Sequence, residues 1–198
     1  MKHPIIKAGG LLFIFTAISI FIVAWIQDNT KESISYNKEQ LILQRLGELV
    51  ENYDNDILQD KLIKENVVLH GIRQDIKVYP AKRNNQIFAY LFEHTYPAGY
   101  NGDIELLTGI SVQKTLLGVR VISHKETPGL GDKIDTRKSN WIKQFSGLSL
   151  TNPSLEKWQV KRDGGVFDAF TGATITPRAI VSATSQLLNA FEQNRLLD

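Results

Sequence analysis

Two threonine hydroxyls flank a Gly-Ala pair near the C-terminal end of the chain, in the stretch Asp-Ala-Phe-Thr-Gly-Ala-Thr-Ile-Thr-Pro from Asp168 to Pro177. An apolar pattern of helical spacing follows to about Arg195, and Thr174 or Thr176 can cap that helix. A helix start carries unpaired N–H groups and partial positive charge, so it suits a phosphate that a nearby hydroxyl can esterify. Taken alone, the stretch is more typical of an ordinary turn and helix cap.

A second stretch with chemical potential is a glycine loop about forty residues earlier. It reads Glu126-Thr127-Pro128-Gly129-Leu130-Gly131. Two glycines around a leucine, behind a proline, form a tight loop whose backbone can closely approach a flat or bulky group. A turn that merely reverses the chain explains the same residues, so both interpretations stay open at this point.

Composition excludes several classes of site. The 198 residues contain no cysteine, which excludes disulfides, thiolate metal sites and a cysteine nucleophile in this chain. The histidines are scattered without metal-ligand spacing: His3, His70, His94 and His124. Lys2 and Lys7 account for the net charge of +2, so the remainder is neutral and shows no electrostatic footprint for nucleic acid.

The N-terminal region predicts a membrane anchor. Ala8–Ile26 is apolar apart from two hydroxyl residues and reaches about 28 Å as a helix, close to the hydrocarbon thickness of a bilayer. A cleaved signal peptide is the alternative, but the small-x-small cleavage pattern is missing. Trp25 suits the interface, and Lys2 and Lys7 keep the N-terminus cytoplasmic by the positive-inside rule.

The remaining chain predicts an α+β domain. Residues 1–27 form the cytoplasmic terminus and anchor, 28–37 a polar linker, and 38–198 the extracytoplasmic domain, which opens with an amphipathic helix over 38–50. Period-two patterns predict four antiparallel strands and a hairpin turn at Arg83-Asn84-Asn85. These strands are Lys77–Ala81, Gln86–Thr95, Ile104–Ile110 and Thr115–Ser123. A short helix is predicted over Asn140–Phe145.

Together these features resemble a known family. The N-terminal anchor, Ala-Gly-Tyr-x-Gly at Ala98–Gly102, Glu-Thr-Pro-Gly-Leu-Gly at Glu126–Gly131 and the terminal Asp-x-x-Thr-Gly-Ala-Thr occur in this order. The chain resembles the membrane-anchored FMN-binding subunits of bacterial redox-driven ion pumps. It is most similar to the G subunits of Rnf (Rsx) electron transport complexes and less similar to the C subunits of sodium-translocating NADH:quinone reductases.

This resemblance implies FMN joined through its phosphate to the hydroxyl of Thr174, the last residue of the Ser/Thr-Gly-Ala-Ser/Thr motif. Thr171 stands where serine is commoner and Phe170 where an aliphatic residue is more usual, and neither departure removes the acceptor hydroxyl. Thr176 lies outside the motif frame. Gly172 and Ala173, within the motif, leave room for the phosphate and for the modifying enzyme.

The resemblance also implies roles for other residues. Glu126–Gly131 would border the isoalloxazine ring, with Thr127 and backbone N–H groups near its polar edge. Leu130 and Trp141 would shield a ring face, or serve as ordinary core. Asp168 would hold the attachment loop, or be read by the FAD-using flavin transferase that the family needs as a maturation partner.

As a whole, the resemblance implies an electron carrier in the bacterial inner membrane, with its FMN domain in the periplasm and other Rnf subunits as partners. The family complex exchanges electrons between NADH and ferredoxin, coupled to ion translocation. This subunit alone would not be a complete enzyme, since no Gly-x-Gly-x-x-Gly dinucleotide fingerprint is present. The alternatives are a sodium-pump C subunit and an anchored periplasmic module that binds a ligand without redox chemistry.

Overall fold

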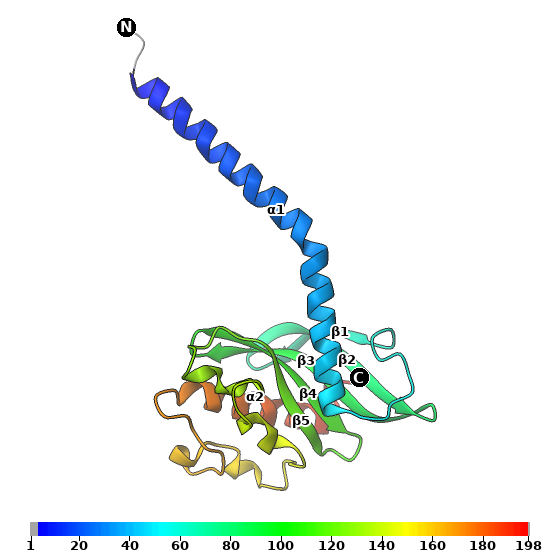
Figure 1. The fold of residues 1–198 in the computed structure, drawn as a ribbon. Coiled ribbons are helices and arrows are strands. Elements are labelled where there is room, and N and C mark those ends of the chain that lie inside the picture. Colours follow the sequence, from blue (N-terminus) through cyan, green and yellow to red (C-terminus); the bar gives the residue numbers. More distant parts are fainter. Residues whose placement is uncertain (1–3, 198) are drawn as a thin grey trace. The chain divides into compact units, whose positions relative to one another are not determined.

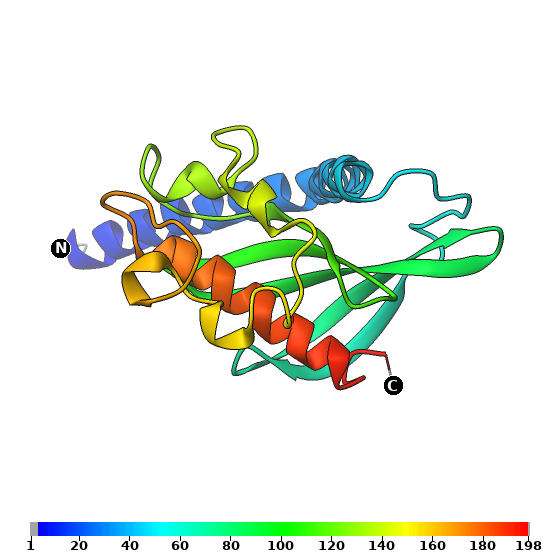
Figure 2. The ribbon, with the colours of Figure 1, turned by 90° about the horizontal axis from the view of Figure 1, so that it is seen from below.

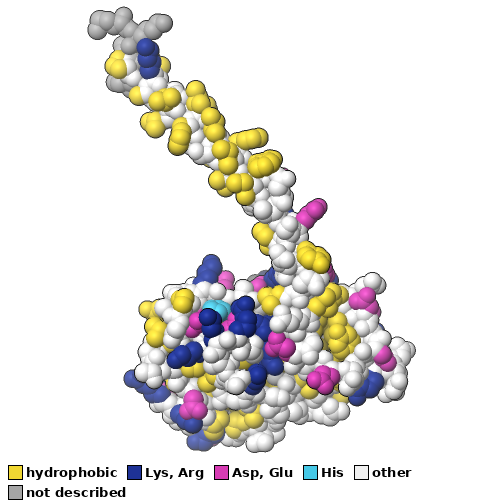
Figure 3. All heavy atoms as spheres, in the orientation of Figure 1, with side chains coloured by type: hydrophobic (Ala, Val, Ile, Leu, Met, Phe, Trp, Pro, Cys, Tyr) yellow, Lys and Arg dark blue, Asp and Glu magenta, His cyan; other side chains and the backbone are white. Residues whose placement is uncertain are grey.

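The computed structural model describes residues 4–197, so Lys2 and His3 lie outside the described part. The first element is helix α1 (Pro4–Leu49). It contains a segment long and apolar enough to cross a membrane, with a mean hydropathy of 2.4. Its apolar side chains, such as Phe13, Phe15 and Phe21, are exposed, and Figure 3 shows this hydrophobic band along the N-terminal part of the helix.

The polar segment 28–37, which was predicted as a linker, is helical and belongs to α1. It lacks glycine and proline, the residues that break a helix. Its polar side chains also bond along the helix: Lys31 Nζ pairs with Asp28 at 2.8 Å, and Thr30 Oγ1 donates to the Ile26 carbonyl at 2.9 Å. The change from apolar to polar residues therefore does not end the helix.

A compact unit begins at Ile42, within the last turns of α1. As predicted, these turns are amphipathic: Ile42, Leu46 and Leu49 are buried against the unit. A Cβ on Gly118, in β5 (Leu116–Ser123), would lie only 2.8 Å from Leu49 Cδ2. The absence of a side chain at Gly118 therefore lets the end of the helix pack this closely. The helix end therefore covers one face of the sheet (Figures 1 and 2).

Five antiparallel strands form this sheet in the sequential order β1-β2-β3-β4-β5. They are β1 (Leu62–Leu69), β2 (Ile72–Arg83), β3 (Gln86–Gly99), β4 (Gly102–Ser111) and β5 (Leu116–Ser123). The four predicted strands correspond to β2–β5, and the predicted turn residues Asn84 and Asn85 adopt positive φ between β2 and β3. The α+β class is confirmed.

Strand β1 was not predicted because its pattern is irregular. A register shift separates Lys64 from Val67, and Asn66 adopts φ 57° inside the strand. This edge strand leaves Leu62, Ile63 and Val68 about half exposed, so no clean alternation of buried and exposed residues marks it in the sequence. Pairing with β2, a tertiary contact, defines the strand.

Helix α2 (Ile175–Glu192) packs across the other face of the sheet, as Figures 1 and 2 show. Phe191 contacts Phe92 of β3 edge-on, with ring centroids 5.6 Å apart, within a core shared by α2 and the sheet. Four short 3-10 helices lie between β5 and α2: η1 (Gly131–Ile134), η2 (Trp141–Phe145), η3 (Leu155–Lys157) and η4 (Lys161–Asp163). The helix expected over 140–145 is thus a 3-10 helix.

A histidine pair links α2 to the sheet. His70 Nδ1 is hydrogen-bonded to Gln186 Oε1 of α2 at 3.1 Å, and His70 Nε2 to His94 Nδ1 at 2.9 Å. His94 Nε2 is in turn bonded to Thr108 Oγ1 at 3.0 Å. Burial lowers the pKa of His70 to about 4, and burial together with the charge of His70 lowers the pKa of His94 well below its usual value.

Candidate functional site

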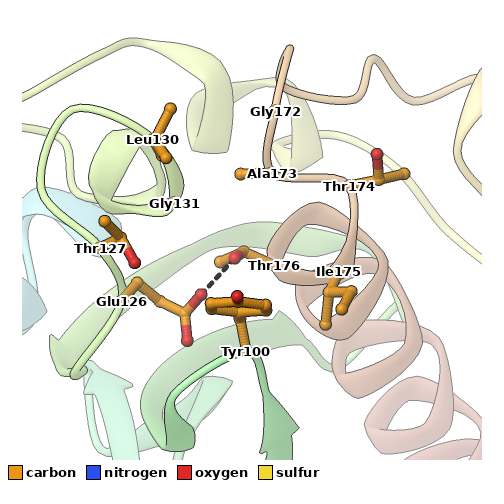
Figure 4. Close-up of a pocket in the computed structure, with 10 residues that line it drawn as sticks. All are labelled: Tyr100, Glu126, Thr127, Leu130, Gly131, Gly172, Ala173, Thr174, Ile175 and Thr176. Atoms are coloured by element: carbon orange, nitrogen blue, oxygen red, sulfur yellow. Dashed lines mark hydrogen bonds between the residues drawn. The ribbon is translucent and has the colours of Figure 1, made fainter.

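A pocket of about 290 Å³ lies where three separate segments meet, near the lower end of the usual size range of ligand sites. The turn between β3 and β4 contributes Tyr100, the loop after β5 contributes four residues, and the start of α2 with its approach contributes five (Figure 4). The lining residues from these loops are Glu126, Thr127, Leu130, Gly131, Gly172, Ala173, Thr174, Ile175 and Thr176. The two motifs predicted from sequence therefore form opposite walls of one cavity.

Some predicted site residues lie outside the pocket lining. Pro128 and Gly129 belong to the glycine loop but do not line the cavity, and neither do Asp168 and Thr171. Asp168 forms an exposed ion pair with Lys161 at 2.7 Å. These four residues shape or flank the loops instead.

The glycine loop is held by its own backbone. The Thr127 carbonyl accepts hydrogen bonds from the N–H groups of Leu130 and Gly131, each at 3.1 Å. Gly129 adopts φ 78°, a left-handed conformation that glycine tolerates without a Cβ penalty. Gly131 approaches the start of α2 so closely that a Cβ there would lie 2.7 Å from Thr176 Oγ1. Both glycines are therefore needed, for different reasons.

Glu126 joins the three segments around the pocket. Its side chain is buried, and Oε2 accepts a hydrogen bond from the hydroxyl of Thr176 in α2. Its Oε1 accepts the backbone N–H of Asn101, in the β3–β4 turn, at 3.1 Å. The same turn is bonded again to the glycine loop through Asn101 Nδ2 and Thr127 Oγ1 at 3.2 Å. Figure 4 shows the Glu126–Thr176 bond crossing between the two loops.

The three nearby threonine hydroxyls differ in environment. Thr176 is fully buried and already bonded to Glu126, whereas Thr171 is exposed and does not line the pocket. Thr174 is half-buried, lines the pocket, and makes no side-chain capping bond although it is the N-cap of α2. Its hydroxyl is therefore the one that combines access with a free oxygen.

The start of α2 supplies further donors. The N–H groups of Ile175 and Thr176 belong to the first turn, where a helix offers no acceptor, and neither bonds to another described residue. Pro177 has no N–H, so the first turn leaves few donors, all close to Thr174. An anion bound here would receive these N–H groups and the favourable end of the helix dipole.

The segment that precedes Thr174 is held in place by contacts with aromatic residues. Trp141 Nε1 donates to the Asp168 carbonyl at 2.8 Å, and its ring meets Phe170 edge-on, with centroids 5.0 Å apart. Trp141 also contacts Phe145 of the core and does not line the pocket. Of its two predicted roles, the geometry favours core packing that positions the attachment loop.

Three large apolar side chains stand around the pocket and remain exposed. Tyr100, Leu130 and Ile175 are 64%, 42% and 46% exposed, respectively. Exposed apolar groups gathered at a cavity are typical of a binding surface. Sequence reasoning singled out Leu130 but missed Tyr100 and Ile175 as site residues. The signal for Tyr100 was its place in Ala98–Gly102, a segment noted only as part of the resemblance.

A buried ionic cluster stands behind the glycine loop. Asp135, just after η1, receives Arg45 Nη2 at 3.3 Å and Arg137 Nη2 at 2.5 Å. Arg45 also pairs with Glu48 at 2.8 Å, and Glu48 with Arg120 at 2.6 Å. Burial opposes the charge of Asp135, but the hydrogen bonds and charges of Arg137, with the charge of Arg45, outweigh it and lower the pKa of Asp135 to about 2. The cluster fixes the end of α1 to the segment that follows the loop.

Comparison with known proteins agrees with this arrangement. A family model described as the FMN-binding domain matches residues 99–189, which include both walls of the pocket, and one described as the RnfG N-terminal region matches residues 1–49. The chain thus contains an FMN-binding domain that follows an N-terminal apolar helix.

Close relatives are similar over nearly the whole chain. A protein of Pseudoalteromonas atlantica, named as the G subunit of the ion-translocating oxidoreductase complex, is 43% identical over 98% of this chain and 92% of the relative. Proteins of the same name from Shewanella baltica and Vibrio atlanticus are 42% and 40% identical, each over 98% of this chain and 93% of the relative. The chain belongs to this family, the G subunits of ion-translocating oxidoreductase complexes. The apolar helix and this membership indicate a membrane-anchored protein.

Proposed function

We propose that the protein is the electron-carrying, FMN-bearing subunit of an Rnf-type ion-translocating oxidoreductase complex. The observation that carries the proposal is the convergence of the two motifs on one pocket, inside the region that matches the FMN-binding domain. FMN, when bound, supplies the electron chemistry, while the protein binds and orients it. The other subunits of the complex are its partners.

FMN is attached covalently through Thr174 in this proposal. The support is chemical: Thr174 offers an accessible hydroxyl without a capping bond, next to free N–H groups at the start of α2. In attachment, Thr174 Oγ1 bonds to the FMN phosphorus of FAD, the pyrophosphate bond breaks, AMP leaves, and the hydroxyl proton passes to a base. The resulting phosphodiester keeps one negative charge beside the helix start, where that charge is favoured. A flavin transferase performs this step.

The residues of the opposite wall fit a flat ring system. Tyr100 and Leu130 offer apolar surface, and Thr127 and Glu126 offer polar atoms beside it. In Figure 4, Thr174 lies toward the α2 side of the pocket and Leu130 and Thr127 toward the glycine loop. With the phosphate on Thr174, the glycine loop and Tyr100 would be the residues that border the isoalloxazine ring.

The decisive experiment is the intact mass of the full chain, purified after co-expression with a flavin transferase. We expect an added mass of one FMN less one water, and Thr174→Ala should abolish it. Thr151→Ala is the matched control, because this exposed threonine lies outside both the attachment motif and the pocket lining, and its loss should leave the adduct in place. Colourless protein of unmodified mass, or an adduct that survives Thr174→Ala, contradicts covalent attachment at this residue.

We further propose that the N-terminus is cytoplasmic and the FMN domain periplasmic. Support comes from Lys2 and Lys7 before the apolar segment, by the positive-inside rule. A reporter active only outside the cytoplasm should be active when fused after the last residue and silent when fused ahead of the apolar segment. The reverse pattern in well-expressed fusions contradicts this topology.

A further inference from the structure

The carboxylate of Glu126 occupies a space made for it by two glycines. A Cβ on Gly99 would lie 2.8 Å from Glu126 Oε1, and a Cβ on Gly131 would lie 2.9 Å from Oε2. A Cβ at either position would force the carboxylate to move, so both backbones approach it this closely because neither residue carries a Cβ. Glu126 itself is only 4% exposed.

The hydrogen-bond partners of this carboxylate are neutral. Its oxygens accept from the Asn101 N–H and the Thr176 hydroxyl, and Glu126 forms no ion pair within residues 4–197. A buried charge stabilised only by dipoles keeps its field, because no counter-charge lies beside it and little water screens it. Glu126 lines the pocket, so that field acts on whatever the pocket holds.

We propose that the Glu126 carboxylate lowers the reduction potential of the flavin held in this pocket, while it positions the three segments that form the wall. Reduction adds negative charge to the flavin, and a fixed negative charge in the pocket wall repels it. The electron donor and acceptor are those of the complex, so Glu126 changes the energy of the transfer without taking part in it. This inference rests on the proposed FMN function.

The test is a spectroelectrochemical titration of the flavin-loaded full chain in detergent at pH 7. Glu126→Gln keeps the size of the side chain and removes its charge, so the midpoint potential should shift to a more positive value. Glu126→Asp keeps the charge and should stay close to the unmodified protein. Asp103→Asn is the matched control, because this exposed carboxylate is the second residue of β4, near the turn that contributes Tyr100, and water screens it.

An unchanged or more negative potential in Glu126→Gln overturns the inference, and so does an equal positive shift in Glu126→Gln and Glu126→Asp, which would indicate altered geometry. If Glu126→Gln does not load flavin, the test is made on the flavin-loaded protein without a substitution. Its covalent flavin should have a lower midpoint potential in the folded chain than after unfolding in urea, and an equal or higher folded value contradicts the proposal. Intact mass separates a failure of this inference from a failure of the proposed function: a chain without an FMN adduct contradicts the proposed function itself.

Discussion

Glu126 and Asp135, two of the buried carboxylates at the glycine loop, are stabilised in opposite ways. Asp135 lies between Arg45 and Arg137, and the chain neutralises its charge within the fold. Glu126 is equally buried but is held by a backbone N–H and a hydroxyl. The first arrangement is an internal ion pair cluster, and the second is an anion without a counter-ion.

The two carboxylates therefore have different roles in the same domain: the charge of Asp135 stabilises the fold, and the charge of Glu126 acts on the pocket. A neutralised pair contributes little field at a distance, so Asp135 serves to fix the end of α1 to the loop. Burying a carboxylate without a counter-charge costs more free energy. Because Glu126 lines the pocket, its charge acts on the environment inside the pocket. Changes at the two sites should therefore affect stability and redox behaviour differently.

The largest expected effect is on stability, from Arg45→Ala. The side chain is 2% exposed and its removal leaves Asp135 and Glu48 each with one arginine fewer, plus a cavity. Breaking a buried pair of this kind costs about 3–5 kcal/mol of unfolding free energy. Urea unfolding of the full chain in detergent, followed by tryptophan fluorescence, measures this cost. Arg45→Met fills the volume and should lose less, and an unchanged midpoint in both variants contradicts the importance of the cluster.

Acidification should act through the histidine pair before it reaches Asp135. The unfolded chain binds protons on histidine near pH 6.5, whereas folded His70 does so at about 4 and the pKa of folded His94 is lowered well below its usual value. Stability therefore falls as the pH drops from about 6.5 toward 4, by at most about 1.4 kcal/mol per pH unit for each histidine. The contribution of Asp135 is present above its unfolded pKa of 3.8 and is lost only as pH falls through about 2.

Unfolding midpoints at intervals between pH 7 and 4 measure this dependence. A His70→Asn, His94→Gln double variant should show a flatter profile over that range. A steep loss that persists in the double variant would assign the acid sensitivity to other groups. The comparison of the two carboxylates is consequently best made at pH 7.

A smaller effect on stability is expected from Glu126→Gln. The amide oxygen still accepts one hydrogen bond, the Thr176 hydroxyl can rotate to accept one from the amide nitrogen, and the cost of burying the charge disappears, so the loss should be at most about 1 kcal/mol. The same urea experiment on flavin-free protein measures it. A loss as large as that of Arg45→Ala would mean that Glu126 acts mainly as a structural residue.

The smallest effect is expected from Arg137→Ala. This arginine contacts the same carboxylate as Arg45, but its side chain is 72% exposed. Water can take the place of this exposed guanidinium while Arg45 still faces Asp135, so the loss should be smaller than that of Arg45→Ala. A loss comparable to that of Arg45→Ala would show that Asp135 depends on the outer arginine rather than on the buried one.

Much of the fold was predictable because local patterns agree with the tertiary structure. The apolar N-terminal helix, strands β2–β5 and helix α2 follow from hydrophobic periodicity. The polarity of residues 28–37 predicted a linker but did not reveal that this segment is helical, since helix formation there depends on the absence of glycine and proline. Strand β1 escaped because its bulge and its exposed edge position remove the periodic signal.

The candidate site was predicted as two motifs but not as a cavity. Spacing alone does not show that Tyr100 and Ile175 reach the same pocket, nor that Pro128 and Asp168 lie outside its lining. The choice between Thr174 and Thr176 rested on the motif frame. Burial and the bond to Glu126 now supply an independent physical reason to favour Thr174.

The sequence by itself determined the membrane-anchoring helix, the α+β class and the two motifs, because hydrophobic period and glycine or threonine placement act over short stretches of chain. Only the tertiary structure decided which hydroxyl stays accessible and which carboxylate is neutralised. Those properties depend on contacts such as Arg45 with Asp135 and Glu126 with Thr176, between residues 90 and 50 positions apart. The accessibility of a hydroxyl and the neutralisation of a carboxylate depend on residues that are close in space, and a local sequence pattern does not show which residues those are.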